Sequence, residues 1–559
     1  MDSNTYLPDV SLRGKTADGC ADGCIMAHTG DNRYEESPKR IKYDRQLRLW
    51  DDHGQYALEA AHVCLINASA TGTEILKSLV LPGVGAFTIL DGKIVTGDDA
   101  GSNFFLDKDS IGKSRAKVAT EHLLELNPDV RGEFVDETLE CILQAEPKFF
   151  SKFTSVIATN VKEPTLLKLA ETLWEQDVPL LVCRSYGMIG YMRLQFSDRT
   201  IIESRPENEF HDLRLDGPFP ALKKFADSID LEKLTDQEHG HVPFVVILLK
   251  YLDSWKSRND GQMPKNMKEK NLFKAEIAKG ARKKDDEENF EEACRAVNRS
   301  ITTTNVPSEV REILNNPLCD NLSSESKLFW ILAKALKEFV DNEGQGCLPV
   351  RGVIPDMTSD TQSYIKLQNI YKAKADEDAH IVYARVQQLL SNLAKPPNFI
   401  SEHEVKVFCK NAHCLRVLHG RSIKDEYNPE KSNVQSLIAD LEHEDSDIIF
   451  YVLLRAVDKF HSEYCRYPGQ TNDEVESDIV KLKNCVSSLM SEWGCSPIMK
   501  DDYVHEMCRF GAAELHSVAA FIGGCAAQEV IKLITGQYVP FNNTLTYYAV
   551  TQSTSVYYL

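Results

Sequence analysis

The segment from Val63 to Leu79 has the layout of a nucleotide-binding loop but lacks most of its glycines. A short apolar strand leads into a turn of small residues and then into a helix. In dinucleotide and ATP folds this turn is rich in glycine, because the chain bends sharply and its backbone N–H groups approach phosphate without a Cβ in the way. The chemistry that this layout indicates is therefore the binding of a nucleotide phosphate.

One glycine of the loop remains. Against a G-x-G-G-x-G pattern, the sequence reads Asn67, Ala68, Ser69, Ala70, Thr71, Gly72. Gly72 holds the position usually needed for a helix to pack on a strand, whereas Ser69 and Ala70 would obstruct close phosphate contact. Asn67 tolerates a left-handed conformation, so the turn need not collapse. We expect this degenerate loop to keep the fold and not to bind a nucleotide.

Three polar residues further along stand where a nucleotide site would use them. Asp91, 24 residues beyond Asn67, lies about where an acidic residue binds a ribose hydroxyl. An aspartate that caps a turn at a strand end explains it equally well. Arg115 and Lys117 are candidate phosphate contacts. No catalytic residue is expected in this chain, because no cysteine lies in a recognisable nucleophile motif with a paired base.

The cysteines and histidines do not form a metal-binding pattern. Fifteen cysteines, an odd number, are spread through the chain, which favours free thiols in a reducing compartment. Cys409 and Cys414 have no second pair at zinc-ligand spacing. We interpret His239 and His241 as a polar loop before a helix and not as metal ligands. No metal site and no bound cofactor are predicted.

Length and charge narrow the protein class. The chain has 559 residues, which predicts two or more domains. Its formal charge of −20 argues against nucleic acid and anionic membranes as partners, because both need a basic face. No apolar run approaches the roughly 20 residues of a membrane span, and the N-terminus lacks a signal-peptide pattern. We expect a cytoplasmic and nuclear protein.

Strand and helix patterns alternate from residue 38 to 212, after a tail at 1–37 whose composition predicts disorder. The predicted strands are 63–66, 86–90, 156–158 and 179–183, and the helices are 72–81, 114–126 and 164–175. This alternation predicts an α/β fold with a doubly wound, mainly parallel sheet of Rossmann-like type.

A helical domain is predicted as an insertion at 213–492, where strand signals are scarce. Its helices are expected at 245–255, 328–340, 359–371, 379–393 and 448–460. The α/β pattern returns at 493–559. There a long helix rich in small residues ends at Gly536, and two strands follow that would complete the sheet.

Several segments resemble one protein family. These segments are YDRQLRLWDDHGQ, CLINASATGTEILKSLVLPGVGAFTILDG, LPVRGVIPDMTSDTQSYIKLQNIY, KDDYVHE and AAFIGGCAAQEVIKLITG. In order and spacing, from about Arg40 to Leu559, they resemble the regulatory subunit of the heterodimeric activating enzyme for the ubiquitin-like modifier Nedd. That family is similar to the inactive half of the ubiquitin-activating enzyme. The resemblance implies an inactive adenylation-like domain, with an insertion that resembles a catalytic-cysteine domain but lacks the cysteine.

The resemblance also implies the partners. A separate catalytic subunit would carry the intact glycine loop, the catalytic aspartate and the thioester cysteine, and would bind ATP and magnesium. It would adenylate the C-terminal glycine of the modifier Nedd, hold it as a thioester and pass it to a Nedd-conjugating enzyme. The complex, and not this chain alone, would then be the enzyme of protein neddylation.

Arg45 matches the arginine that in this family reaches the ATP in the partner's site. A guanidinium suits that role, because it is permanently charged and offers a planar fork of donors to phosphate. The residues alone favour an ion pair with Asp44 or another carboxylate instead. Tyr43, Leu47 and Trp50 form a helical stripe of either core or interface character, and their closeness to Arg45 favours the interface.

Two further regions match partner contacts in the family. One is His241, and the other is the segment 355–368. The candidate contact residues of this segment are Pro355, Asp356, Met357, Tyr364 and Leu367. Asp356, with Thr358 or Ser359, would cap the helix that follows. A loop and helix packed only within the insertion explain the same spacing equally well.

The chain departs from the family at a few positions. Asp51 stands where the family often has glycine, Cys525 takes an alanine-like place, and the tail is longer. Two other functions remain as alternatives, a self-sufficient adenylating enzyme with a diverged loop and a nicotinamide-dependent oxidoreductase. The missing glycines and the lack of a hydride site argue against the oxidoreductase. ATP binding by the isolated chain would favour the adenylating enzyme.

Overall fold

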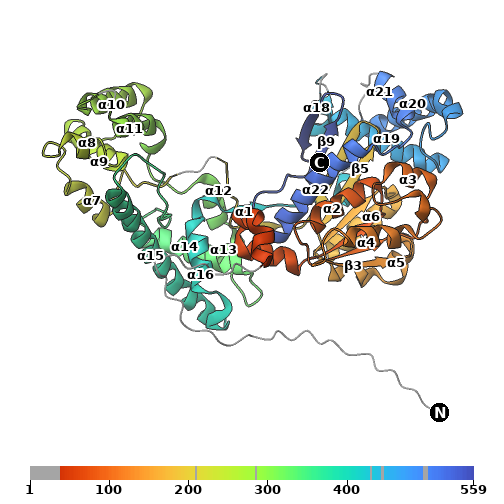
Figure 1. Ribbon diagram of the computed structural model, residues 1–559, viewed down its shortest axis with the longest axis horizontal. Helices are drawn as coiled ribbons and strands as arrows, with labels where there is room; N and C mark the ends of the chain where they lie inside the picture. The colour runs from red at the N-terminus through yellow and green to blue at the C-terminus, as the bar shows by residue number, and fades with distance from the viewer. Residues whose placement is uncertain are drawn as a thin grey trace, which may run out of the picture. The chain divides into compact units, whose positions relative to one another are not determined.

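The computed structural model describes residues 38–207, 211–283, 286–428, 431–441, 443, 446–494 and 501–559. The predicted tail at 1–37 lies outside the described residues. The chain divides into two compact units, Met1–Arg45 and Gln46–Leu559. The first contributes residues 38–45, which begin helix α1 (Pro38–Ala60). The second holds the elements that follow (Figure 1).

A mixed sheet organises the α/β part of the second unit. In the described residues its strand order is β10-β9-β6-β5-β4-β1-β2-β3. Strands β5 to β3 in this order pair in parallel, and β6, β9 and β10 extend the sheet in antiparallel pairs. The strands are β1 (His62–Ile66), β2 (Ala86–Leu90), β3 (Arg131–Val135), β4 (Ser155–Thr159), β5 (Leu180–Tyr186), β6 (Ile189–Gln195), β9 (Thr544–Tyr548) and β10 (Ser553–Tyr557). The predicted α/β fold is confirmed, and the two C-terminal strands complete the sheet.

The central strands are apolar on both faces, as a parallel sheet covered by helices requires. Val63 of β1 aligns with Phe87 of β2 and with Ser155 of β4, and β2 and β4 are buried throughout. The edge strand β3 instead exposes Arg131 and Glu133, and charges of this kind discourage pairing with another chain.

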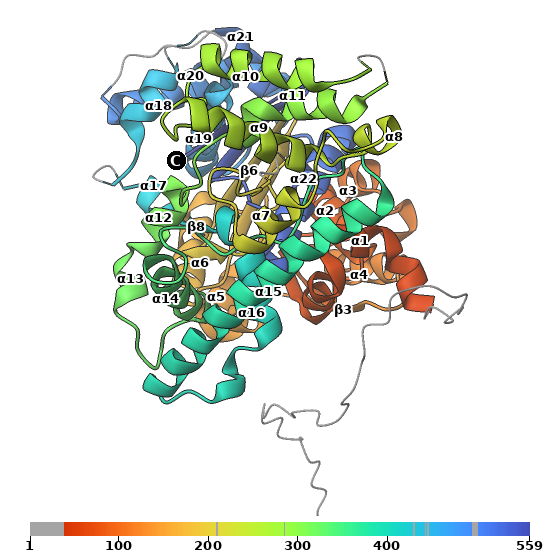
Figure 2. The ribbon, with the colours of Figure 1, turned by 90° about the vertical axis from the view of Figure 1, so that its left-hand side faces the viewer.

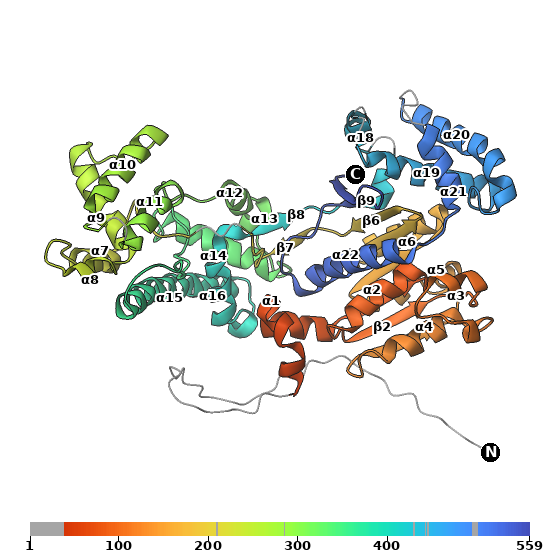
Figure 3. The same cartoon turned by 45° about the horizontal axis from the view of Figure 1, so that its top comes forward.

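Helices cover both faces of the sheet (Figure 3). Those that share an apolar core with β1 and β2 are α2 (Ala70–Val80), α4 (Arg115–Leu124) and α22 (His516–Thr535). Those that share a core with β4 and β5 are α5 (Leu139–Ala145) and α6 (Glu163–Glu175). The short helix α3 (Gly97–Ser102) follows β2.

Helix α22 packs directly against α2 (Figure 3). A Cβ on Gly523 would lie 2.7 Å from Glu74 Cβ, so this approach requires glycine. The helix ends where Gly536 adopts a φ of 64°, which confirms the predicted cap. Among the described residues α22 is the one helix long and apolar enough to span a membrane by length and composition, contrary to the sequence expectation. Its apolar character serves the core, in which much of it is buried.

The middle of the chain is helical, as predicted. Its helices are α7 (Pro220–Asp227), α8 (Asp236–His239), α9 (Phe244–Arg258), α10 (Met267–Gly280), α11 (Glu288–Ser300), α12 (Ser308–Leu314), α13 (Pro317–Asp320), α14 (Leu328–Asp341), α15 (Thr361–Asn392) and α16 (Glu402–Lys410). They enclose one core around α9 and the start of α15, and another around α14 and α16. Figure 2 shows α15 running beside α7, α14 and α16.

Two details of this region differ from the sequence prediction. The helices expected at 359–371 and 379–393 are one continuous helix, α15, of 32 residues. The residues between them contain no proline or glycine and favour a helix, so nothing interrupts it. Strands β7 (Arg199–Ile201) and β8 (Arg416–Leu418) form a small antiparallel sheet that the sequence pattern missed, because three residues are too few to show a period.

The last helices of the predicted insertion pack on the sheet. These are α17 (Ile423–Glu426), α18 (Val434–Leu441), α19 (Ile448–Tyr464), α20 (Val475–Glu492) and α21 (Asp501–Phe510). Apolar residues of α18 to α21 share a core with Tyr186 and Ile189 of the sheet and with Leu559. The domain limits stay predictions, and this core continues across the limit between residues 492 and 493.

Candidate functional site

The loop between β1 and α2 is held by its own polar side chains. Asn67 has a φ of 65°, and its side-chain amide donates to Thr159 O at 2.7 Å. Ser69 is the N-cap of α2, where its Oγ accepts the Gly72 N–H at 3.2 Å and donates to Thr159 Oγ1 at 3.0 Å. Both side chains are therefore used within the chain, at positions where a glycine loop leaves space for phosphate.

Gly72 lies where α2 packs on β1. A Cβ at this position would meet Asn67 O at 2.8 Å and Leu65 Cδ1 at 3.0 Å. We predict that Gly72→Ala lowers the free energy of unfolding by roughly 1–3 kcal/mol, because the added methyl overpacks a backbone that cannot retreat. Urea denaturation of the full chain measures this change.

The matched control for Gly72→Ala is Gly524→Ala on α22. A Cβ on Gly524 meets nothing within 4 Å, so this variant is expected to keep or raise stability, since alanine favours a helix. Equal destabilisation of the two variants would contradict the packing role of Gly72.

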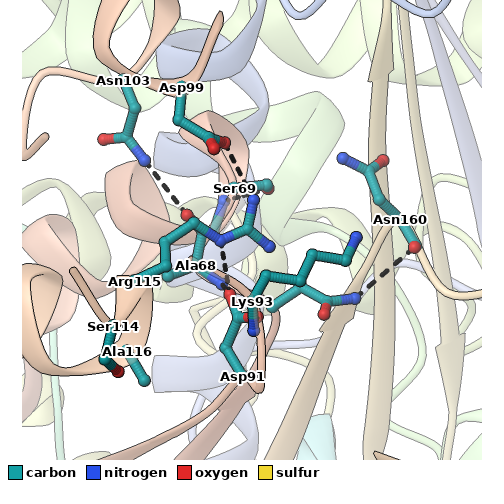
Figure 4. A network of polar contacts seen from close by, with 12 residues as sticks. Ala68, Ser69, Asp91, Lys93, Asp99, Asn103, Ser114, Arg115, Ala116 and Asn160 are labelled. Carbon is teal, nitrogen blue, oxygen red and sulfur yellow. Dashed lines mark hydrogen bonds and ion pairs between the residues drawn. The ribbon is translucent and has the colours of Figure 1, made fainter. Parts of the chain in front are cut away.

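Asp91 contacts the loop and a buried arginine (Figure 4). Its Oδ2 accepts the Ala68 N–H at 2.8 Å and Arg115 Nε at 2.6 Å. Another guanidinium nitrogen of Arg115 donates to Asp99 at 2.9 Å. Asp91 is 2% exposed and Arg115 is 7% exposed, so these charges neutralise one another inside the protein.

The two candidate phosphate cations differ in their surroundings. Burial alone would lower the pKa of Arg115, but Asp91 and Asp99 outweigh burial and raise it, so the guanidinium is charged and neutralised within the network. Lys117 is exposed and lies 4.0 Å from Glu121 on the next turn of α4. Burial and the charge of Arg115 lower the pKa of Lys93, which lies beside this network. Arg115 is therefore committed to two aspartates of its own chain.

A carboxylate from near the other end of the chain contacts the N-terminus of α2. Glu514 Oε2 accepts the Ala70 N–H at 3.1 Å, and Oε1 accepts the Thr71 hydroxyl at 2.7 Å. Thr71 Oγ1 also lies 2.8 Å from Ser185 Oγ. The free N–H groups and the positive end of a helix dipole attract an anion, and here the anion belongs to the protein itself.

These contacts do not fit a bound triphosphate. A phosphate at the loop would need the Ala70 N–H that Glu514 holds, and a ribose would need the Asp91 carboxylate that Arg115 holds. The side chain of Ser69 adds bulk at the same turn.

The predicted residues of α1 differ in exposure. Arg45 is 94% exposed, and its Nε lies 3.9 Å from Asp44, so the predicted ion pair is weak and the guanidinium reaches solvent. Leu47 is half-buried. Tyr43 is 3% and Trp50 is 7% exposed, and Trp50 belongs to the core shared with α2. Burial of both side chains favours the core character of this stripe, and their contact with a partner stays a prediction.

Asp51 divides α1 into two helical segments. Its φ of 56° and ψ of −179° lie in a region that glycine adopts without strain and other residues do not. Its carboxylate accepts a hydrogen bond from Arg205 at 2.9 Å, and such a surface pair contributes little stability. The chain therefore carries strain where the resembling family often has glycine.

We predict that Asp51→Gly raises the free energy of unfolding by about 1 kcal/mol. The relieved strain should exceed both the lost contact with Arg205 and the larger chain entropy of glycine. Chemical denaturation measures the change, and Asp51→Ala is the control, since it removes the contact but keeps the strain. A glycine variant no more stable than the alanine variant would disprove the strain at Asp51.

His241 and the segment 355–368 lie side by side, although they are far apart in the sequence. The Asp360 N–H donates to His241 O at 3.3 Å, and both residues line a groove of about 770 Å³. The groove also contains Glu238 and the exposed start of α15. The structure thus brings together two regions that the resemblance assigns to the same partner.

The segment has an exposed side and a buried side. Asp356 is exposed, and Pro355 and Tyr364 are half-buried. Met357 is 8% exposed and Leu367 is fully buried, and both belong to the core around α9. These two side chains anchor the segment from beneath, and their contact with a partner stays a prediction.

The cap of α15 also differs from the expectation. Asp360 caps the helix and accepts the Ser363 N–H at 2.9 Å, in place of Asp356 or Thr358. Thr358 donates its N–H and its hydroxyl to Glu292 at 2.9 and 2.8 Å. This double contact fixes the turn before α15 to helix α11.

A second groove, of about 910 Å³, lies between α7 and α15. It is lined by apolar side chains that include Phe219, Ile365 and Ile370. Ile365 is 48% exposed, which is unusual for a large apolar side chain on a helix that otherwise packs in two cores. The start of α15 therefore contributes to a polar groove and to an apolar one.

The surroundings of His239 differ from the polar loop that was predicted for it. This histidine ends helix α8, is buried, and its Nδ1 lies 3.0 Å from Glu287, an acidic partner 48 residues away. Its ring stacks on Phe290 with centroids 4.9 Å apart. Among the described residues, no group of three or more histidine, cysteine or acidic side chains is placed to hold a metal ion. The described cysteines are free thiols.

The sequence analysis missed Glu514 and Thr159 as loop residues. Thr159 closes the turn at the end of β4, and its position after a short apolar strand could have indicated this role. The sequence signal at Glu514 is a single acidic residue before the apolar helix α22, which is not specific.

Comparison with known proteins places the whole folded region in context. Residues 43–557 match the ThiF family. The chain is 52% identical over 526 residues to the "NEDD8-activating enzyme E1 regulatory subunit" of Xenopus laevis, covering 93% of this chain and 99% of that protein. It is 51% identical over 528 residues to the protein of the same name from Gallus gallus, covering 94% and 99%. For the Danio rerio protein the identity is 50% over 529 residues, again covering 94% and 99%.

Proposed function

This chain belongs to the ThiF family and, within it, to the regulatory subunits of the NEDD8-activating enzyme E1, and from this premise we propose that it is the non-catalytic member of a heterodimer. As a regulatory subunit it serves the activation of a ubiquitin-like modifier. The proposal adds that adenylation and thioester formation take place in a second, catalytic subunit.

One observation carries the non-catalytic role, namely that the loop's anion-binding groups are occupied by the chain's own side chains. Glu514 holds the Ala70 N–H, and Asp91 holds both the Ala68 N–H and Arg115. Because these donors would have to bind phosphate in an active adenylation site, their internal use supports a chain that leaves ATP and magnesium to its partner.

The proposed reaction follows from the chemistry of modifier activation. The partner uses ATP to adenylate the C-terminal glycine of NEDD8, captures it on a cysteine as a thioester, and transfers it to a conjugating enzyme. Arg45 supports a contribution in trans, because an exposed guanidinium on α1 is free to bind the phosphate oxygens of a neighbouring subunit.

We place the partner contacts on the two grooves beside the start of α15. His241 lines the polar groove and the exposed Ile365 lines the apolar one, and the exposed Asp356 precedes α15. Pro355, Tyr364 and the half-buried Leu47 complete the proposed contact set. Such a mixture is typical of protein interfaces, which combine apolar anchors with a polar rim.

The proposed location is the cytoplasm and the nucleus. The free thiols of the described cysteines support a reducing compartment. The formal charge of −20 supports partners other than nucleic acid and anionic membranes.

Co-purification tests this function. The tagged full chain, isolated from cells under mild conditions, should carry a stoichiometric ThiF-type partner with an intact glycine loop, identified by mass spectrometry. The isolated chain, titrated calorimetrically with ATP and magnesium, should show no binding. Tight ATP binding without a partner would instead support a self-sufficient adenylating enzyme.

A further inference from the structure

The N-terminus of α2 is an anion site by construction. The first N–H groups of any helix lack partners within the helix and carry the positive end of its dipole. In α2 the Gly72 N–H is taken by Ser69 Oγ, at 3.2 Å. The Ala70 N–H is taken by Glu514 Oε2, at 3.1 Å. The Ala70 N–H is the donor that would otherwise point to a ligand.

The backbone around Glu514 holds its carboxylate in place. Glu514 forms an isolated parallel bridge with Gly187, in the turn between β5 and β6, and the Gly187 N–H donates to Ala513 O at 2.7 Å. Helix α22 begins two residues later, at His516. The side chain thus extends from a fixed junction, and its two oxygens reach Ala70 and Thr71 without a flexible loop between them.

A second carboxylate serves the same loop. Asp91 accepts the Ala68 N–H at 2.8 Å, so alternate amides of the loop are bound by acidic side chains from two distant parts of the chain. Asp91 has Arg115 as a counter-ion at 2.6 Å, whereas the contacts that define the position of Glu514 are the helix N-terminus and the Thr71 hydroxyl. Glu514 therefore has the partners that a phosphate would have.

We propose that the Glu514 carboxylate is an internal anion that replaces a nucleotide phosphate and makes the folded loop independent of any nucleotide. It joins the N-terminus of α2 to the start of α22 through groups that bind phosphate in an intact loop. This inference does not depend on the partner subunit. It implies that removing the carboxylate uncovers a site for a small oxyanion such as inorganic phosphate.

The test uses the purified full-length chain and hydrogen exchange of the segment 63–79. In Glu514→Ala the Ala70 amide should exchange roughly tenfold faster, because it loses a charge-assisted hydrogen bond. The thermal midpoint should fall by roughly 2–4 °C. Inorganic phosphate at about 50 mM should restore most of the protection, and chloride of equal ionic strength should not, because it screens charge without offering oxygen acceptors.

Two further variants make the result specific. Glu506→Ala removes a half-buried glutamate of α21 that pairs with Arg509, and should change neither exchange in 63–79 nor the response to phosphate. Glu514→Gln keeps the volume and loses the charge, so exchange should rise about threefold with no recovery in phosphate, since the site is still filled.

Phosphate-dependent protection in Glu514→Ala, absent from the parent chain and from Glu506→Ala, supports the inference. Unchanged exchange at Ala70, or equal recovery in chloride and phosphate, overturns it. If the alanine variant fails to fold, the glutamine variant decides, and exchange equal to that of the parent chain overturns the inference.

Discussion

Replacing Arg45 with alanine is expected to slow adenylate formation by the assembled heterodimer by on the order of 10²-fold or more. A guanidinium that reaches a transferring nucleotide from a second subunit stabilises charge that develops at the phosphate, and such arginines carry large rate effects. The side chain is 94% exposed and only weakly paired with Asp44, so its loss should leave fold and assembly intact. Pyrophosphate exchange measures the adenylation rate directly.

Two control variants distinguish a specific role of the Arg45 guanidinium from the loss of any positive charge on this helix. Arg48→Ala removes an equal charge from an exposed position of the same helix and should keep the rate near that of the parent enzyme. Arg45→Lys retains the charge but loses the planar fork of donors. Its adenylation rate should lie between the rates of Arg45→Ala and the parent enzyme. An Arg45→Ala complex with unchanged exchange kinetics would remove the only residue of this chain proposed to touch ATP.

The second large effect is expected at the start of α15. Replacing Ile365 with aspartate should weaken association with the catalytic subunit by about 100-fold, because a charge would be buried where an apolar anchor fits. Ile365 is 48% exposed and lines the groove between α7 and α15, so the isolated chain should tolerate the change. Deleting 355–368 is a poorer test, since it removes the buried Leu367 and the Asp360 cap of α15.

Surface plasmon resonance with the immobilised catalytic subunit measures this loss. The matched control is His380→Asp, which introduces the same charge at an exposed position further along α15, outside both grooves. The control should bind like the parent chain, and all three chains should share one thermal midpoint. Equal affinity of Ile365→Asp and the parent would exclude this face as the interface.

Much of the fold could be predicted because it depends on local patterns. The run of apolar residues at 63–66, followed by the turn residue Asn67, specifies β1, and the left-handed Gly536 ends α22 as its residue type suggests. The contacts of the candidate site were harder to predict, because local patterns do not indicate which distant residues a side chain will contact. Trp50 has the spacing of either a core or an interface stripe, and only the packed structure shows it in the core.

The unpredicted contacts are those between distant residues. The Ala70 N–H and Glu514 are separated by 444 positions, and His239 and Glu287 by 48. A sequence without homologous sequences beside it holds no record of such pairs. The missing glycines indicate a loop that differs from a phosphate loop, but they do not reveal which groups satisfy its backbone donors.

The long separation of β6 and β9 along the sequence has a consequence for biosynthesis. The sheet holds strands from both ends of the chain, since β9 pairs with β6 and lies beyond the whole helical insertion. At typical translation speeds of about 5–20 residues per second, roughly 20 to 70 seconds separate the emergence of β6 and β9 from the ribosome. During that time the edge of the apolar strand β6 that pairs with β9 is unpaired, and such an edge promotes aggregation. Loss of the last few dozen residues by a late stop codon would leave β6 without β9 and the sheet incomplete.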